Sequence, residues 1–401
     1  MWEQIRDNQI RSALLVTAMG IVLLLIGFFI GYVFLGDPVI GIVIAALVWG
    51  IMNLVALFQG DSIILGMSGA RKIGPDDHPR LYNVVEEMKI ASGLQKMPDI
   101  YIVDDQALNA FSTGRDPQHA SVAITSGLLD KLNRDELQGV IGHEVAHINN
   151  RDIRLMMLAS ILLGSIVILS WYATRILFFG GMGGRRSSSG GGGAAIIILI
   201  VGLVLMILAP IFAQLIYFAV SRRREYLADA SSALYTRYPD GLASALEKLQ
   251  NSDTKVQKAN KATAPMYISN PFYKGGSAGN DLFATHPPLA ERIHILRAMS
   301  GASYNDYEQS YKAVKKESVI PAAELAGAGT VALRQATPGA EAGDLQEQLD
   351  RTRQTSDVLW RVHGYRTLNC SNCGTLMRLP PNYNLPRVRC PHCGYDNEVN
   401  V

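Results

Sequence analysis

The chain has 401 residues, enough for more than one domain, and its 37 basic residues nearly balance 35 acidic ones. This balance gives no bulk attraction to nucleic acid, and a hydrophobic fraction of 48% is high for a soluble protein. The apolar residues gather in four long blocks, which predicts a membrane protein rather than a soluble globular one.

The first two apolar blocks lie at the N-terminus, at residues 12–36 and 39–58, and neither contains a charged residue. About 20 apolar residues suffice for a helix to cross a bilayer, and only Asp37 and Pro38 separate the blocks. We therefore predict a transmembrane helical hairpin over residues 1–60. A cleaved signal peptide is the alternative, but the first block is too long, lacks a small-residue cleavage site and is followed at once by another block.

A capped helix is predicted to begin at Asn133, because Glu136 completes a capping box and apolar residues then recur at helical spacing. His143 and His147 are four residues apart, so both imidazoles project from one helical face and can bind one ion. Glu144 lies beside the first histidine, where a carboxylate can take a proton from zinc-activated water. Ordinary core or surface histidines are the alternative. The H-E-x-x-H spacing favours the catalytic zinc site of a protease.

Two further apolar blocks, at residues 155–179 and 194–220, flank a Gly/Ser-rich loop. Their length predicts two more transmembrane helices, although a buried or half-inserted hairpin of the enzyme domain also fits. Basic residues next to the blocks give the orientation, because positive charge concentrates on the cytoplasmic side. Most of these residues place both termini and the catalytic domain in the cytoplasm, and three argue the other way. The majority are Arg6, Arg11, Arg71, Lys72, Arg80, Arg222, Arg223 and Arg224, and the minority are Arg175, Arg185 and Arg186.

A catalytic zinc site needs a third protein ligand and one open position. Glu225 follows the fourth block and can supply that ligand, and Asp229 lies four residues later on the same helical face. Asp229 can then accept a hydrogen bond from the imidazole of a metal ligand. The alternative is an ordinary helix whose acids pair with the preceding arginines. If His147 and Glu225 bind one ion, the chain between them must cross the membrane an even number of times, so the third and fourth blocks both span or both do not.

The first three quarters of the chain closely resemble the HtpX family of membrane-bound zinc metalloproteases, which are relatives of the CAAX prenyl endoproteases. The stretches that carry the resemblance are LNAFSTGRDPQHASVAITSGLL, ELQGVIGHEVAHINNRD, EYLADA and THPPLAERI, in the order found in the family. The resemblance implies that His143, His147 and Glu225 are zinc ligands and that Glu144 is the general base. It also suggests Asp229 as the carboxylate that orients His143.

Two further residues gain a role only through this resemblance. Asn109 would lie on an edge strand beside the cleft and hydrogen-bond the substrate backbone, and predicted strands at residues 99–103 and 121–125 flank it. His286 would donate a hydrogen bond to the developing oxyanion. From the sequence alone, Asn109 is a turn residue and His286 is a helix-start residue ahead of two prolines.

The last quarter of the chain lies beyond this resemblance. Residues 301–358 are predicted to be a helical and flexible linker, because residues 316–356 are rich in Ala, Gly, Glu and Gln with scattered Pro. Residues 359–401 contain two C-x2-C pairs with sixteen residues between them, the spacing of a zinc ribbon. Disulfides are the alternative, which a cytoplasmic location disfavours. His392 lies within the second pair, but four thiolates already suffice. The predicted ligands of this structural zinc are Cys370, Cys373, Cys390 and Cys393.

The ribbon is also basic, which bears on its partners. Its arginines permit contact with nucleic acid, but no extended face of aromatic and basic residues accompanies them, so nucleic-acid binding is not expected. A protein partner, recruitment of substrate or plain stabilisation is favoured instead.

Together these patterns predict an α+β zincin-type metalloprotease domain at residues 61–300, interrupted by a hydrophobic hairpin at 155–220. Four transmembrane helices and a small C-terminal zinc ribbon complete the predicted fold. The expected protein is a multi-pass endopeptidase of the cell (inner) membrane with two zinc ions, one catalytic and one structural. Its implied substrates are membrane proteins, misfolded or damaged ones among them. A prenyl-protein endoprotease and a non-enzymatic membrane scaffold that recruits partners through the ribbon are the competing functions.

Overall fold

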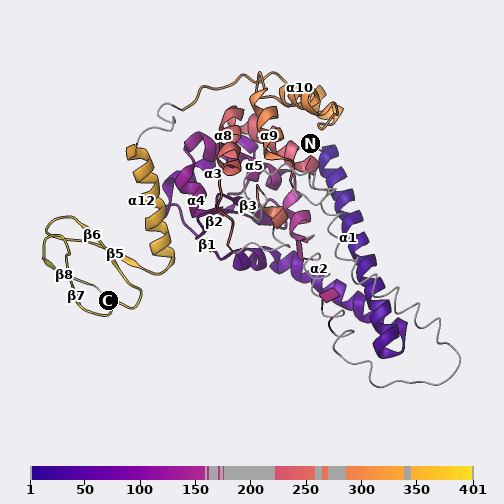
Figure 1. The fold of residues 1–401 in the computed structure, drawn as a ribbon, viewed down its shortest axis with the longest axis horizontal. Helices are drawn as coiled ribbons and strands as arrows, with labels where there is room; N and C mark the ends of the chain where they lie inside the picture. The colour runs from indigo at the N-terminus through magenta and orange to yellow at the C-terminus, as the bar shows by residue number, and fades with distance from the viewer. Residues whose placement is uncertain are drawn as a thin grey trace.

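The computed structural model describes residues 2–158, 160–161, 170–171, 175, 222–257, 264–269, 286–337 and 345–399. A four-stranded sheet covered by helices lies at the centre, a long helical pair projects from it, and a small β-rich unit lies at the C-terminus (Figure 1). Most of the third predicted membrane block and all of the fourth lie outside the described residues.

The predicted N-terminal hairpin is present as two antiparallel helices, α1 and α2 (Figure 1). Gly36 adopts a left-handed φ of 72° at the turn, and the Asp37 side chain accepts the Val39 N–H at the start of α2. A Cβ on Gly41 would lie 2.1 Å from the carbonyl oxygen of Gly27, so this close helix crossing requires glycine. The hairpin comprises α1 (Trp2–Ile30), a π-helical turn (Gly31–Leu35) and α2 (Pro38–Ser68).

Within the described residues, α2 is the one helix whose length and apolar composition would let it cross a membrane. Its most apolar stretch is only 17% buried, and Leu47, Leu54 and Phe58 are each more than half exposed. Such exposure of large apolar side chains is normal for a surface that faces lipid and unusual for one that faces water. A shorter apolar stretch, Val16–Ile30, lies in α1. The structure thus supports one membrane helix and leaves the predicted total of four untested.

α2 continues to Ser68, past residue 60, the predicted end of the N-terminal hairpin. Ile64 and Leu65 near its end are almost fully buried and pack with Met157 and Tyr267 of the protease part. The last turns of α2 therefore belong to the protease core, and the apolar helix runs directly into that core.

The sheet has the strand order β1-β2-β4-β3, in which β2 and β4 are parallel and the outer strands are antiparallel to their neighbours. The strands predicted at residues 99–103 and 121–125 are confirmed as β2 and β4. β3 lies between them in sequence and forms the edge of the sheet. The strands are β1 (Ala70–Lys72), β2 (Asp99–Val103), β3 (Ala110–Gly114) and β4 (Ala120–Thr125).

The helix with the H-E-x-x-H spacing, α5, lies in the middle of the core. Its predicted capping box is confirmed, because Asn133 Oδ1 accepts the Glu136 N–H at 2.9 Å and Glu136 Oε2 accepts the Asn133 N–H at 2.7 Å. A Cβ on Gly139 would lie 2.5 Å from the Leu242 nitrogen, so this glycine lets α8 approach α5 closely. The helices around the sheet are α3 (Pro79–Ser92), α4 (Ser126–Lys131), α5 (Arg134–Asn149), α8 (Pro239–Gln250) and α9 (Leu289–Arg297), with further helical residues at 152–158 and 222–236.

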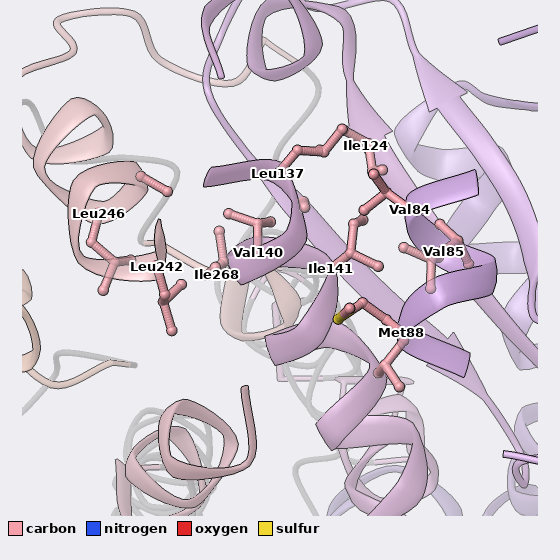
Figure 2. Packing of buried hydrophobic residues seen from close by; sticks show 14 of the residues in the cluster. Val84, Val85, Met88, Ile124, Leu137, Val140, Ile141, Leu242, Leu246 and Ile268 are labelled. Carbon is pink, nitrogen blue, oxygen red and sulfur yellow. The ribbon is translucent and has the colours of Figure 1, made fainter. Parts of the chain in front are cut away.

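Apolar side chains fill both sides of α5 (Figure 2). One side meets α3 and the sheet, and the other side meets α8 and Ile268. This burial on two sides fixes the position of α5, and therefore of the histidines that it carries. The residues labelled in Figure 2 are Val84, Val85, Met88, Ile124, Leu137, Val140, Ile141, Leu242, Leu246 and Ile268.

Residues 301–337, predicted as part of a linker, pack against the protease core, and we call them the C-terminal strap. Tyr307 is fully buried and Ile320 nearly so, and both join the main apolar core. Further along, Arg334 Nη2 donates to Asp135 Oδ1 at 2.7 Å. The strap packs on the core because its few aromatic and branched side chains are buried there. Its overall composition, rich in small and polar residues, does not indicate this burial. It contains α10 (Tyr304–Lys315) and α11 (Ala322–Ala326).

Two carboxylates that bind residues of the strap, those of Asp135 and Glu308, are stabilised in their charged form. Burial would raise the pKa of Asp135, but hydrogen bonds from Thr337 and Arg334 outweigh burial and keep the pKa below its ordinary 3.8. Burial would also raise the pKa of Glu308, but hydrogen bonds from Ser318 and two backbone N–H groups outweigh it and keep that pKa below 4.5. Because both folded pKa values lie below the unfolded ones, this stabilisation is present above pH 4.5 and is lost as the pH falls through the folded values.

Replacing Asp135 with asparagine is expected to lower the melting temperature at neutral pH and to weaken its dependence on acid. The change removes charge-assisted hydrogen bonds, which contribute about 1.5–3 kcal/mol each. Differential scanning calorimetry in detergent between about pH 7 and pH 4, with the exposed Asp253→Asn as control, measures both effects. An acid dependence of Asp135→Asn equal to that of the wild type would contradict the assignment.

The C-terminal unit is attached through α12 (Leu345–Val362), which packs against α4 and buries Val358 completely. Arg361 Nη1 lies 3.3 Å from Asp77 Oδ1 and ties the end of α12 to the loop before α3. Two antiparallel hairpins come next in the chain, well separated from α1 and α2 (Figure 1). They are formed by β5 (Arg366–Asn369), β6 (Leu376–Leu379), β7 (Arg387–Arg389) and β8 (Asp396–Glu398).

Candidate metal and active site

The two histidines of α5 meet a glutamate from helical residues 222–236. His143 Nε2 and His147 Nε2 are 3.2 Å apart, and both side chains are buried. Glu225 places Oε1 at 3.4 Å from His147 Nε2 and Oε2 at 3.6 Å from His143 Nε2. The structure therefore brings the three predicted ligands into one cluster, although 78 residues separate His147 from Glu225 in the sequence.

The spacing of these atoms fits a zinc ion. Zinc bonds to imidazole nitrogen and carboxylate oxygen are about 2.0–2.2 Å long, which in tetrahedral geometry separates two ligand atoms by about 3.3–3.6 Å. The three separations in the cluster are 3.2, 3.4 and 3.6 Å. Glu225 Oε2 is buried and makes no hydrogen bond to any described residue. A buried carboxylate oxygen without a hydrogen bond is costly. The Arg292 Nη1 group, 3.5 Å away, donates to the Ile268 carbonyl instead, so this oxygen can still serve as a ligand of a metal cation.

A carboxylate holds the other ring nitrogen of each histidine. Asp229 Oδ1 lies 3.0 Å from His143 Nδ1, and Asp152 Oδ2 lies 3.2 Å from His147 Nδ1. A carboxylate at Nδ1 favours the tautomer that leaves Nε2 free to bind a metal. Asp152 reaches back to α5 because Arg151 adopts a left-handed φ of 61° where that helix ends. Both imidazoles are thus oriented toward the cluster.

Glu144 is buried next to the cluster and receives a hydrogen bond of 2.8 Å from the Ser112 hydroxyl of β3. Burial raises the pKa of Glu144 above its ordinary value of 4.5, although the two histidines and Ser112 lower it. A carboxyl group with a raised pKa is better matched to accepting and donating protons near neutral pH. The position and the pKa both suit a general base.

His286 lies in the turn before α9, and its Nε2 is 3.9 Å from Glu225 Oε2. Burial lowers the pKa of His286 to about 4, so the ring is neutral at pH 7 and carries one N–H. The structure therefore places this residue beside the metal cluster. Its donation to an oxyanion stays a prediction.

Asn109 is buried at the start of β3, and its side chain binds backbone of its own chain. Nδ2 donates to the Ser269 carbonyl at 3.1 Å, and Oδ1 accepts the Ala110 N–H at 3.1 Å. The Ile268 N–H donates to the Ala110 carbonyl at 2.9 Å, so residues 264–269 already cover the first part of the β3 edge. Asn109 thus lies at the predicted edge strand, and a substrate strand would have to displace residues 264–269 in order to pair with the first part of β3.

Arg292 of α9 is fully buried among these groups. Its Nε and Nη2 donate to the two Asp229 carboxylate oxygens at 2.8 and 2.7 Å. Its Nη1 donates to the Ile268 carbonyl at 3.1 Å and lies 3.5 Å from Glu225 Oε2. No pattern in the sequence had assigned a role to this arginine.

Ser112 and Asp152 were also missed. Both, like Arg292, stand inside the stretches that carry the family resemblance. Their position inside such a stretch could have marked these polar residues as candidates. The neighbouring sequence, however, does not indicate which distant side chain each of them contacts.

The four cysteines form a second cluster. The Sγ atoms of Cys370 and Cys393 are 3.5 Å apart, and those of Cys373 and Cys390 are 3.6 Å apart. Zinc–sulfur bonds of about 2.3 Å separate two tetrahedral ligands by about 3.8 Å, close to these distances. All four cysteines are free of disulfides, so the arrangement suits a metal ion and not the disulfide alternative.

Comparison with known proteins agrees with this geometry. The sequence profile described as Peptidase family M48 matches residues 75–300. A "Protease HtpX homolog" of Streptococcus gordonii is 42% identical over 75% of this chain and 100% of its own length, and one of Dictyoglomus turgidum is 46% identical over 67% and 85%. A homolog of the same description from Streptococcus pneumoniae is 44% identical over 75% of this chain and 100% of its own.

Among solved structures, the one titled "Crystal Structure of S. mikatae Ste24p" matches 73% of this chain and 66% of its own, at 20% identity and a TM-score of 0.36. That likeness is too distant to support any structural conclusion. The profile match and the relatives matched over most of their length are enough to assign the family without it. Together with the His143, His147 and Glu225 cluster, they favour neither of the two competing functions, the non-enzymatic scaffold and the prenyl endoprotease. The chain belongs to peptidase family M48 and, within it, to the HtpX group of membrane metalloproteases.

Proposed function

We propose that this protein is an integral-membrane zinc endopeptidase that cleaves membrane proteins, misfolded or damaged ones in particular, with its active site on the cytoplasmic side. The observation that carries the proposal is the cluster of His143, His147 and Glu225, with Glu144 buried beside it. The apolar helix α2 ends against the same core, where Ile64 packs near β3. A peptide emerging from a bilayer would therefore reach the site over a short distance.

Each residue of the cluster has a proposed role. A zinc ion held by His143, His147 and Glu225 would polarise the scissile carbonyl and acidify the attacking water. Glu144 would accept a proton from that water at its carboxylate and pass it to the leaving amine. His286 would donate its N–H to the oxygen of the scissile carbonyl as negative charge develops there.

The cluster also constrains the topology. Helical residues 152–158 leave the site, and residues 222–236 return to it, with His147 Nε2 and Glu225 Oε1 only 3.4 Å apart. In the proposed topology, both ends of the segment between them therefore lie on one side of the membrane. The proposed hairpin over residues 155–220 satisfies this by crossing twice, and the basic residues beside the blocks favour the cytoplasmic side.

Proteolysis by the purified protein in liposomes tests the proposal. The substrate is a membrane protein with a destabilised fold, and its stable parent and a prenylated peptide serve as comparisons. We expect cleavage of the destabilised protein, loss of cleavage on zinc chelation and recovery when zinc is returned. Cleavage that persists under complete chelation would refute a zinc peptidase, and cleavage of the prenylated peptide alone would favour the prenyl endoprotease.

Metal content provides a separate prediction. We expect two zinc ions per chain, one in the His/His/Glu cluster and one in the four-cysteine cluster. A Cys370→Ser, Cys390→Ser double variant should bind one zinc ion and keep the hydrolytic site. Atomic absorption on purified protein measures the stoichiometry, with Ser371→Ala, an exposed residue of the same loop, as control. Two zinc ions in the double variant would show that the cysteines do not bind the second.

A further inference from the structure

We propose that Arg292 is a positioning residue that fixes two of the three metal ligands, acting on His143 through Asp229 and directly on Glu225. This inference rests on the proposed zinc site and assigns a role to a residue outside its ligand set. The first observation is a shared oxygen. Asp229 Oδ1 receives Arg292 Nη2 at 2.7 Å and lies 3.0 Å from His143 Nδ1. Arg292 thus holds the oxygen that orients the imidazole, and its Nη2 also lies 3.4 Å from His143 Nδ1 itself.

The second observation is the geometry of the guanidinium group. Arg292 binds both oxygens of Asp229, through Nε at 2.8 Å and Nη2 at 2.7 Å, which fixes the plane of the carboxylate as well as its position. The remaining nitrogen, Nη1, donates to the Ile268 carbonyl at 3.1 Å and faces Glu225 Oε2 at 3.5 Å. A lysine carries the same charge but has no planar fork, so it cannot reproduce these contacts together.

The third observation is the charge of the buried site. Within the described part of the chain, four buried carboxylates lie in or beside the cluster, namely Glu144, Asp152, Glu225 and Asp229. Among the described residues, two buried arginines face these carboxylates: Arg292 pairs with Asp229 and Glu225, and Arg224 lies near Asp152. Arg292 is therefore part of the charge balance of the metal site.

A parallel but looser arrangement lies behind the other histidine. Arg224 Nη1 is 4.0 Å from Asp152 Oδ1, and Asp152 Oδ2 faces His147 Nδ1 at 3.2 Å. Because the Arg224 contact is longer than the Arg292 contacts, we expect Arg292 to have the larger effect.

Arg292 also connects the metal site to the sheet edge. The Ile268 carbonyl that it binds belongs to residues 264–269, which pair with the start of β3 and hold the Asn109 side chain at Ser269. One guanidinium group thus contacts both the carboxylates of the metal site and the segment that pairs with β3.

The test is Arg292→Lys, compared with Arg297→Lys as matched control. Arg297 lies in the same helix and also pairs with two carboxylates, Asp240 and Glu247, but at the surface. Zinc affinity of the hydrolytic site is measured by competition with a chromophoric chelator, in the Cys370→Ser, Cys390→Ser background. We expect Arg292→Lys to weaken zinc binding about 10- to 100-fold, the usual effect of removing a group that orients a metal ligand, and Arg297→Lys to leave it unchanged.

A double variant shows whether Arg292 acts through Asp229. In an Asp229→Asn background, Arg292→Lys should weaken zinc binding far less than it does alone, because the two changes break one contact. Equal effects in both backgrounds would overturn the proposed route. If Arg292→Lys is not recovered folded, Asp229→Asn with Arg292 intact carries the test, since it removes a charged acceptor of the guanidinium, and wild-type zinc affinity in that variant would overturn the proposal.

The outcomes separate this inference from the proposed function. If the wild-type protein binds no zinc at the His/His/Glu cluster, the proposed function fails. If the wild type binds zinc and Arg292→Lys binds it equally well while melting at a lower temperature, Arg292 is only structural and the inference alone fails.

Discussion

Glu144→Gln is expected to abolish peptide-bond cleavage while the protein keeps its zinc. Glutamine has nearly the same shape but cannot accept a proton from water, and loss of a general base typically lowers a rate by about 10²–10⁴-fold. Because Glu144 is not one of the three clustered ligand residues, metal content should not change. The measurement is cleavage rate together with zinc stoichiometry on the same preparation.

An exposed carboxylate supplies the control for this variant. Glu86→Gln, on the solvent side of α3, should cleave at the wild-type rate. Wild-type cleavage by Glu144→Gln would remove Glu144 from the mechanism. Loss of zinc in that variant would instead make Glu144 a metal-site residue rather than a base.

Removal of the strap is expected to have the largest effect on stability. A chain ending at residue 302 loses the burial of Tyr307, Tyr311, Val319 and Ile320 against the main core. Each such side chain contributes about 1.5–3 kcal/mol, so the total for the four is about 6–12 kcal/mol, comparable with the whole stability of many domains. We expect this chain to be unfolded or aggregated at physiological temperature.

A chain ending at residue 337 is the matched control, since it keeps the strap and loses only α12 and the four-cysteine unit. It should remain folded and bind one zinc ion, with a smaller decrease in melting temperature from the loss of α12. If the chain ending at residue 302 melted at the same temperature as the one ending at 337, the strap would not stabilise the protease core. Because the profile match ends at residue 300, the result also shows whether this extension has become part of the core in this protein.

Much of the candidate site could be predicted because its signals are local. The four-residue spacing of His143 and His147, the capping box at Asn133 and the paired cysteines all express the geometry of a single helix or turn. The even-crossing argument extended this to Glu225 through chain topology. Asn109 shows the limit, because its partner Ser269 lies 160 residues away and no local pattern predicts that contact; its hydrogen bond to substrate stays a prediction.

The sequence by itself determined the zinc-peptidase character, the apolar α2 and the four-cysteine cluster, since each depends on residue types at short, fixed spacing. Only the tertiary structure decided that the supposed linker is a strap and that Ser112, Asp152 and Arg292 lie against the clustered residues. The physical reason is that such contacts arise when separate elements pack. Arg292 lies 63 residues from Asp229 and 149 from His143 in the sequence. Patterns over a few residues do not predict which distant charged side chains will be buried next to each other.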